Sequence, residues 1–154
     1  NLNVVLVEPE IPQNTGNISR TCVLTNCTLH LVGPLGFSTD DKHLKRAGLD
    51  YWSYLKSHYY HSLDEVYAKY PTARYFYSST HGTVRYTDIQ YRQGDFIVFG
   101  KETAGLPKDL LRKNEGRVIR IPMVKESTRS LNLSNSVAIV AYEALRQIGF
   151  PDMR

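Results

Sequence analysis

Polar side chains of the kind that bind and orient ligands gather in the last third of the chain. Four of them directly precede an apolar run at residues 137–142, namely Ser130, Asn132, Ser134 and Asn135. We predict a helix with Ser134 as its N-cap, because a serine hydroxyl can accept from a free amide at a helix start. The same amides and side chains can also hold a ligand. A well-capped core helix without a site is the alternative, since caps are common.

The apolar run also indicates how this helix is buried. Residues 137–142 place apolar side chains on every side of the helix, so it must be covered all round. A chain of 154 residues has few layers for this purpose, and we expect a second subunit to provide part of the cover. Gly149 followed by Pro151 predicts where the helix ends.

Length and composition indicate one globular domain over residues 1–154. Apolar residues make up 42% of the chain and charged residues 22%, as is ordinary for globular proteins. No apolar run is long enough to span a bilayer, and no charged and apolar leader precedes the first predicted strand. A net charge of +4 permits a polyanionic partner without requiring one.

The cysteines and histidines do not form a metal site in this sequence. Cys22 and Cys27 are five residues apart, which fits neither a zinc spacing nor a disulfide framework. The five histidines show no metal-ligand pattern. We therefore expect no metal, and two reduced thiols in a cytoplasmic protein.

Short apolar runs rich in β-formers alternate with helical segments. Strands separated by helices are typical of βαβ units, so we predict an α/β fold with a parallel sheet and helices on both faces. Ligands in such sheets bind beyond the carboxyl ends of the strands. The predicted strands are residues 2–7, 29–32, 74–78, 95–99 and 117–121, and the predicted helices before residue 130 are residues 18–26, 41–47, 62–70 and one that opens with Pro107.

The segment after the first predicted strand carries a candidate anion site. Asn17, Arg20 and Thr21 fall on one face of the predicted helix, at i, i+3 and i+4. A fixed guanidinium beside amide groups suits a phosphate. An exposed arginine on an ordinary helix is the alternative.

Residues 100–107 form a second candidate loop, after the strand at residues 95–99. Two glycines there allow the backbone to approach a flat ligand, and Glu102 can accept a hydrogen bond from it. An ordinary strand-to-helix turn is the alternative, as is a solvated turn for residues 78–82. Neither G-x-G-x-x-G after the first strand nor a P-loop motif is present, which disfavours Rossmann-type dinucleotide binding and P-loop phosphoryl transfer.

Three of these segments form an ordered set of motifs: NTGNISR at residues 14–20, FGKETAGL at residues 99–106 and SLNLSNSVA at residues 130–138. In order and spacing they resemble the motifs of the SPOUT class of RNA 2′-O-ribose methyltransferases. The segments EPEIP at residues 8–12 and RAGLDY at residues 46–51, with the compact length, resemble its TrmL (YibK) branch. That branch modifies the wobble nucleotide of certain tRNAs. The resemblance covers essentially the whole chain.

The resemblance implies a fold and an assembly. Its parallel sheet would end in a C-terminal segment threaded into a trefoil knot, within a single SPOUT domain. The donor S-adenosyl-L-methionine would bind in the knot, and two copies would form a homodimer that acts on the anticodon region of tRNA. Small departures concern loop details: Lys101 replaces a common proline, and the loop between Met123 and Arg129 is one residue longer than in some relatives.

The resemblance also implies roles for individual residues. Arg20 matches the catalytic arginine, and Asn14 and Asn132 would act with it, while Glu102 and Ser130 help to arrange it and the substrate. The donor, and its product S-adenosyl-L-homocysteine, would lie against Ser78, Gly100, Glu102, Ile121, Met123, Ser130 and Leu131.

The chemistry that this implies needs little covalent help from the protein. Methyl transfer from a sulfonium is an in-line displacement, so catalysis can come mostly from positioning the 2′-hydroxyl. A guanidinium pKa above about 12 makes the neutral base scarce. We therefore expect Arg20 to orient the ribose and its phosphate and to lower the pKa of the hydroxyl, with the proton leaving through phosphate or water.

Cations and aromatic residues provide candidate RNA contacts. Tyrosine or tryptophan side chains at residues 51–60 can stack on an unpaired base, although packing under the sheet is the alternative for most of them. The candidate phosphate contacts are Lys42, Lys45, Arg46, Arg112, Lys113, Arg117 and Arg129.

Two rival functions stay open at this point. One is a non-catalytic RNA-binding homodimer with the same fold, and the other is a small-molecule enzyme of ordinary doubly wound type, whose motif is missing. Intact Arg20, Glu102 and Asn132 favour the methyltransferase.

Overall fold

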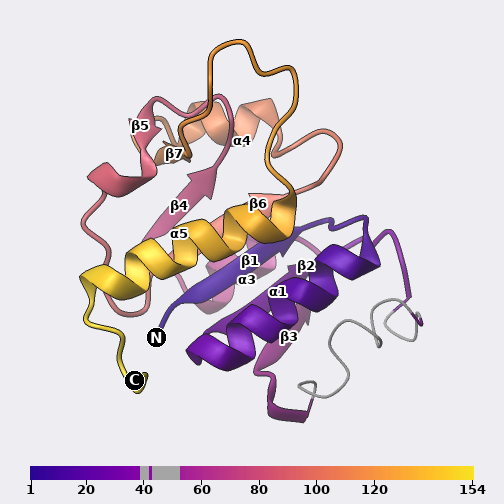
Figure 1. Cartoon of the computed structure of the whole chain (residues 1–154). Helices are drawn as coiled ribbons and strands as arrows, with labels where there is room; N and C mark the ends of the chain where they lie inside the picture. The colour runs from indigo at the N-terminus through magenta and orange to yellow at the C-terminus, as the bar shows by residue number, and fades with distance from the viewer. Residues whose placement is uncertain (39–41, 43–52) are drawn as a thin grey trace.

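The computed structural model describes residues 1–38, 42 and 53–154 and contains a seven-stranded sheet (Figure 1). Its order is β3-β2-β1-β6-β4-β7-β5, and every neighbouring pair is parallel. The predicted α/β fold with a parallel sheet is therefore confirmed. The strands are β1 (Asn3–Val7), β2 (Thr28–Val32), β3 (Ser57–Tyr60), β4 (Tyr75–Ser78), β5 (Val84–Arg85), β6 (Phe96–Gly100) and β7 (Val118–Arg120).

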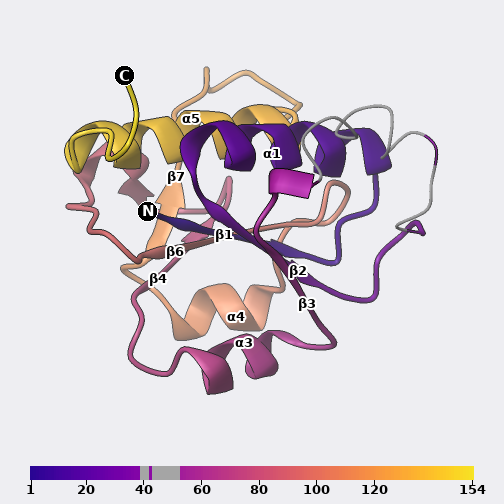
Figure 2. The ribbon, with the colours of Figure 1, turned by 90° about the horizontal axis from the view of Figure 1, so that it is seen from below.

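Helices cover both faces of this sheet, as Figure 2 shows. Alternation along the strands explains the two layers: Val4 and Leu6 of β1 join one core cluster, and Val5 and Val7 join the other. A strand buried on both faces needs an almost continuous apolar sequence, which is the pattern that located β1. On the first face lie α1 (Pro12–Thr25) and α5 (Leu133–Gln147), and on the second lie α3 (Leu63–Lys69) and α4 (Lys108–Lys113).

The first helix starts earlier than the sequence prediction. α1 begins at Pro12 rather than at residue 18, so Asn14 and Asn17 lie in its first turns and not in a loop. Proline fits this start because the first helical positions have no amide partner within the helix. The left-handed Asn26 ends α1.

The last helix also starts differently from the prediction. α5 begins at Leu133, and its N-cap is Asn132 rather than Ser134. The Asn132 side chain accepts from the backbone amides of Ser134 and Asn135, which leaves Ser134 inside the first turn. Gly149 follows the helix end with a φ of 87°, as the predicted stop requires.

The remaining elements divide between confirmed and missed predictions. Ser62 caps α3, as predicted, by accepting from the amide of Glu65. Pro107 is the N-cap of α4 and not its first helical residue. Strands β3 and β5 were not predicted, and the predicted helix at residues 41–47 lies almost entirely outside the described residues. Every helix in the described part of the chain falls short of the length and hydrophobicity needed to cross a bilayer.

A buried histidine links β2 to its neighbours. The ring of His30 lies with Nδ1 2.8 Å from the Tyr60 hydroxyl and Nε2 2.9 Å from Asn3 Oδ1. Since the Asn3 amide nitrogen donates elsewhere, Oδ1 accepts from Nε2–H, and Nδ1 accepts from Tyr60. Burial, with smaller contributions from His58 and Lys69, lowers the pKa of His30 from 6.5 to about 4.

This depressed pKa predicts a loss of stability in mild acid. Because the unfolded chain binds the proton more readily, the stabilisation is complete above pH 6.5 and is lost as the pH falls toward 4. We expect the free energy of unfolding of the wild type, relative to His30→Gln, to fall by about 3 kcal/mol over this range. Urea denaturation at several pH values measures the difference, with the exposed His61→Gln as control. A difference that is constant with pH would contradict the prediction.

Candidate functional site

A cavity of about 490 Å³ lies at the carboxyl ends of four neighbouring strands, β1, β6, β4 and β7. This is the edge at which open α/β sheets bind ligands, and the volume is in the usual range for small-molecule sites. The cavity is lined by Ile11, Asn14, residues 78–81, residues 99–106, Ile121, Met123, residues 130–133 and Ser136.

The cavity brings together nearly all of the residues predicted for the site. Asn14 and Asn132, predicted to be catalytic, both line it. Arg20 is not among the lining residues and lies exposed on α1. The predicted donor-binding residues all line the cavity: Ser78, Gly100, Glu102, Ile121, Met123, Ser130 and Leu131.

Arg20 lies on a different side of α1 from the cavity residue Asn14. Six residues separate them, which corresponds to about 9 Å along the helix axis and a third of a turn around it. Asn17 and Arg20 are both exposed and Thr21 is half-buried, in agreement with the face predicted from their spacing. A single copy of the described chain therefore does not bring this guanidinium to the cavity.

Glu102 connects the segment after β6 to the start of α1. Its Oε1 accepts from the Glu10 amide at 2.8 Å, and its Oε2 accepts from the Ile11 amide at 2.8 Å and from Asn14 Nδ2 at 3.2 Å. A carboxylate is favoured there because a helix start presents free amides and a positive partial charge. Glu102 is thus held as an acceptor for protein amides, at the wall of the cavity.

Asn14 also forms a hydrogen bond with Asn132, and so links Glu102 to α5. Its Oδ1 accepts from Asn132 Nδ2 at 3.0 Å, while Asn132 Oδ1 accepts from the amide of Ser134 at 2.8 Å. Each asparagine therefore uses its oxygen and its nitrogen in opposite directions, which assigns the orientation of both amides. The result is one chain of hydrogen bonds from Glu102 to the N-terminus of α5.

A second set of hydrogen bonds joins the segment after β1 to the segment after β6, and sequence reasoning missed it. Glu10 accepts from the Thr103 amide at 3.0 Å and from its hydroxyl at 2.8 Å, and these bonds lower the pKa of Glu10. Lys101 forms an ion pair with Glu8 at 3.6 Å. Glu10 belongs to the EPEIP segment, but no local pattern in the sequence points to Thr103 as its partner.

Gly100 allows two backbone segments to meet at the cavity. A Cβ at this position would lie 2.6 Å from the Val7 carbonyl oxygen, closer than real contacts allow. The neighbouring strands therefore need glycine here, whereas the sequence interpretation assigned this glycine to the approach of a flat ligand. Gly105 adopts a φ of 70°, which also favours glycine.

The lining has the mixture of groups that a nucleoside-bearing ligand requires. Ile121, Met123 and Leu131 provide apolar surface for a flat base, while Ser78 and Ser130 provide hydroxyls for polar groups. His81 lines the cavity too, in a loop for which a solvated turn was the alternative prediction. In residues 1–38, 42 and 53–154 there is no group of metal-ligating side chains.

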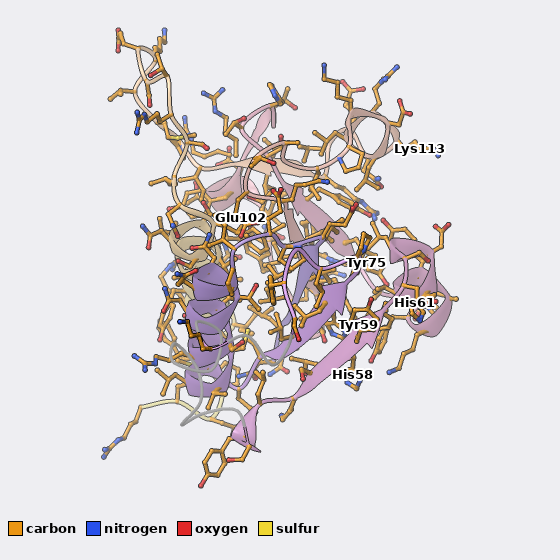
Figure 3. The ribbon with its side chains drawn as sticks, turned by 90° about the vertical axis from the view of Figure 1, so that its right-hand side faces the viewer. His58, Tyr59, His61, Tyr75, Glu102 and Lys113 are labelled. Carbon is orange, nitrogen blue, oxygen red and sulfur yellow. The ribbon has the colours of Figure 1, made fainter. Side chains whose placement is uncertain are left out.

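The predicted RNA contacts are only partly described by the structure. Tyr54 and Tyr59 are 75% and 52% exposed, whereas Tyr60 is buried, so the stretch contains both stacking candidates and core residues. Figure 3 shows Tyr59 on the strand at the edge of the sheet. Lys42 is exposed, and the other predicted contacts up to residue 52 lie outside the described residues.

Comparison with known proteins gives the family. The model of the SpoU rRNA Methylase family matches residues 1–142. This chain belongs to that family. A relative from Photorhabdus asymbiotica, named tRNA (cytidine(34)-2'-O)-methyltransferase, is 50% identical to this SpoU-family chain over 97% of it and 95% of the relative.

Solved structures of similar proteins agree with the SpoU assignment. One, described as "Structural insights into the 2-OH methylation of C/U34 on tRNA", has a TM-score of 0.90 and 40% identity, and covers 96% of this chain and 95% of its own. The SpoU methyltransferase AviRb from Streptomyces viridochromogenes was solved with AdoMet. It has a TM-score of 0.82 and 26% identity, over 95% of this chain and 60% of its own.

The hydrogen bonds of Glu102 predict that its charge is important for stability. We expect Glu102→Gln to lower the free energy of unfolding by about 1–3 kcal/mol, because an amide cannot accept from three N–H groups at once. Chemical denaturation measures the loss, and Glu126→Gln is the matched control in an exposed loop. Equal stability of the two variants would show that the connection through Glu102 is dispensable.

Proposed function

We propose that this SpoU-family protein transfers a methyl group from S-adenosyl-L-methionine to the 2′-hydroxyl of the nucleotide at position 34 of tRNA, cytidine or modified uridine. The observation that carries the proposal is that three separated sequence motifs meet around one cavity. Relatives that match nearly the full chain are named for methylation at this position, which supports the choice of substrate.

The donor fits the lining of this cavity. The apolar side chains of Ile121, Met123 and Leu131 suit its adenine, and the polar groups of Ser78 and Ser130 suit its ribose and amino-acid parts. S-adenosyl-L-homocysteine, the product, would occupy the same place. AdoMet bound to the related AviRb supports this ligand.

The rate of this reaction depends chiefly on how the 2′-hydroxyl is positioned relative to the methyl donor. The donor supplies a methyl group on a sulfonium, and the new carbon–oxygen bond forms as the carbon–sulfur bond breaks and the hydroxyl loses its proton. The protein must hold the hydroxyl in line with the breaking bond. Asn14 and Asn132 are suited to this role because their mutual hydrogen bond fixes both amides at the wall of the cavity.

Arg20 acts in this proposal as an orienting group. A guanidinium group stays charged at neutral pH, so it binds the ribose and its phosphate and stabilises the developing alkoxide. The proton then leaves through phosphate or water.

A homodimer completes the site in this proposal. Arg20 lies away from the cavity of its own chain, and the layer of α1 and α5 leaves Leu24 and Tyr142 57% and 43% exposed. A second copy packed on this layer would cover them.

We also propose a trefoil knot in the single SPOUT domain over residues 1–154. The buried free thiols of Cys22 and Cys27 and a tRNA substrate support a cytoplasmic location.

Transfer of tritiated methyl groups to bulk tRNA tests the proposed function. We expect incorporation at position 34, and a missing 2′-O-methyl group there in RNA from a strain without this protein. Binding of tRNA without incorporation would indicate the non-catalytic RNA-binding homodimer instead.

The orienting role of Arg20 gives a kinetic prediction. We expect Arg20→Lys to lower kcat at least about tenfold, because the charge remains but the two-pronged hydrogen bonding is lost. Calorimetric affinity for S-adenosyl-L-homocysteine should stay within about twofold of the wild type. Arg92→Lys, which alters an exposed arginine outside α1 and α5, is the control. Normal turnover of Arg20→Lys with an unchanged pH profile would refute the role.

The dimer gives a prediction for the exposed apolar layer. We expect Tyr142→Glu to weaken self-association at least about tenfold, because the interface would have to bury a charge without a partner. Sedimentation equilibrium measures the effect, and methyl transfer should fall in parallel. For self-association, Tyr54→Glu, which alters an exposed tyrosine outside α1 and α5, is the control. A wild type that sediments as a monomer would exclude the dimer.

A further inference from the structure

Two arginines lie side by side at the outer edge of the sheet. The edge strand β5 pairs with β7 in the register Val84 with Ile119 and Arg85 with Arg120. Parallel neighbours are about 4.8 Å apart, and residues in register project from the same face of a sheet. Both arginines are exposed. Their guanidinium groups can therefore reach the same anion.

Neither guanidinium group has a partner among the residues that the structure describes. Arg74, Arg112 and Arg146 pair with carboxylates, but no side-chain hydrogen bond or ion pair involves Arg85 or Arg120 in the described residues. Like charges opposite each other on neighbouring strands repel. This edge of the sheet therefore places two unpaired cations where an anion would relieve their repulsion.

The excess positive charge of the chain is concentrated around this pair. Residues 108–129 contain seven Lys or Arg and three Asp or Glu, whereas the other residues contain twelve of each. The whole formal charge of +4 therefore falls in a segment that runs from α4 through β7 into the following loop. Figure 1 shows α4, β7 and β5 together at one end of the sheet, and Figure 3 shows Lys113 projecting outward.

The pair also adjoins the cavity. Arg120 directly precedes Ile121, which lines it, and residues 78–81 line it just before the chain enters β5. Gly82 keeps this connection close, since a Cβ there would lie 2.8 Å from the backbone of Ile119. The two guanidinium groups therefore sit at the same carboxyl edge of the sheet as the candidate site.

We propose that Arg85 and Arg120 form a clamp for one phosphate of the tRNA backbone next to the methylated nucleotide. Guanidinium groups match phosphate oxygens with paired hydrogen bonds, and such contacts position a nucleic acid without reading its sequence. The clamp rests on the proposed function, because it identifies the anion as part of the RNA substrate. The remaining cations of residues 108–129 extend the same surface.

Binding of tRNA at several salt concentrations tests the clamp in the full-length protein. We expect the double variant Arg85→Gln/Arg120→Gln to bind tRNA about tenfold more weakly, with a slope of log K against log salt smaller by about 1. The KM for tRNA should rise while kcat at saturating tRNA stays within about twofold. Affinity for S-adenosyl-L-homocysteine should be unchanged, which shows that the variant is folded.

A charge-matched control separates the clamp from a general loss of charge. Arg92→Gln/Arg154→Gln removes the same two charges at exposed positions outside residues 108–129, and its salt slope should change by less than half as much. Equal effects of the two double variants, or a Kd for the first within twofold of the wild type, would overturn the clamp and leave the methyltransferase standing. A wild type that binds tRNA and transfers no methyl group would refute the proposed function and, with it, the assignment of the clamp to a substrate.

Discussion

The carboxylate of Glu102 joins the segment after β6 to the first turn of α1, and the walls of the cavity depend on that bond. Both of its oxygens accept from protein amides, and Asn14 extends the connection to Asn132 at the start of α5. Asn14 and Asn132 are 118 residues apart in the chain. Each link orients the next one, because an asparagine amide that donates on one side must accept on the other. The site is therefore positioned by side chains rather than by the sheet alone.

Much of the fold was predictable because its central strands are buried on both faces. Strands β1 and β6 are apolar along almost their full length, and the sheet requires this pattern where helices cover both sides. The edge strands lack that constraint. Only one residue of β3 is buried and β5 has two residues, so neither carries a periodic signal. The start of α1 was missed because the residues before Ile18 are polar and include Gly16, which normally favours a loop.

The candidate site was predictable in its members but not in its connections. The family resemblance named nine residues that line the cavity, because the segments that contain them follow strands whose carboxyl ends meet. The hydrogen bond from Thr103 to Glu10 joins positions 93 residues apart, and no pattern within either loop indicates it. The pairing of Arg85 with Arg120 depends on the register of two strands that are not consecutive in the chain. Such contacts follow from the tertiary structure, which propensities do not specify.

One wall of the cavity is formed by residues that are synthesised after all seven strands, and this order has a consequence for biosynthesis. Residues 130–133 and Ser136 close the cavity, and α5 must pack on α1 for Asn132 to reach Asn14. A nascent chain can assemble most of its strands while these residues are still inside the ribosome. We therefore expect an unfinished polypeptide to lack a complete cavity, so that prematurely terminated products would not compete with the finished protein for its ligand.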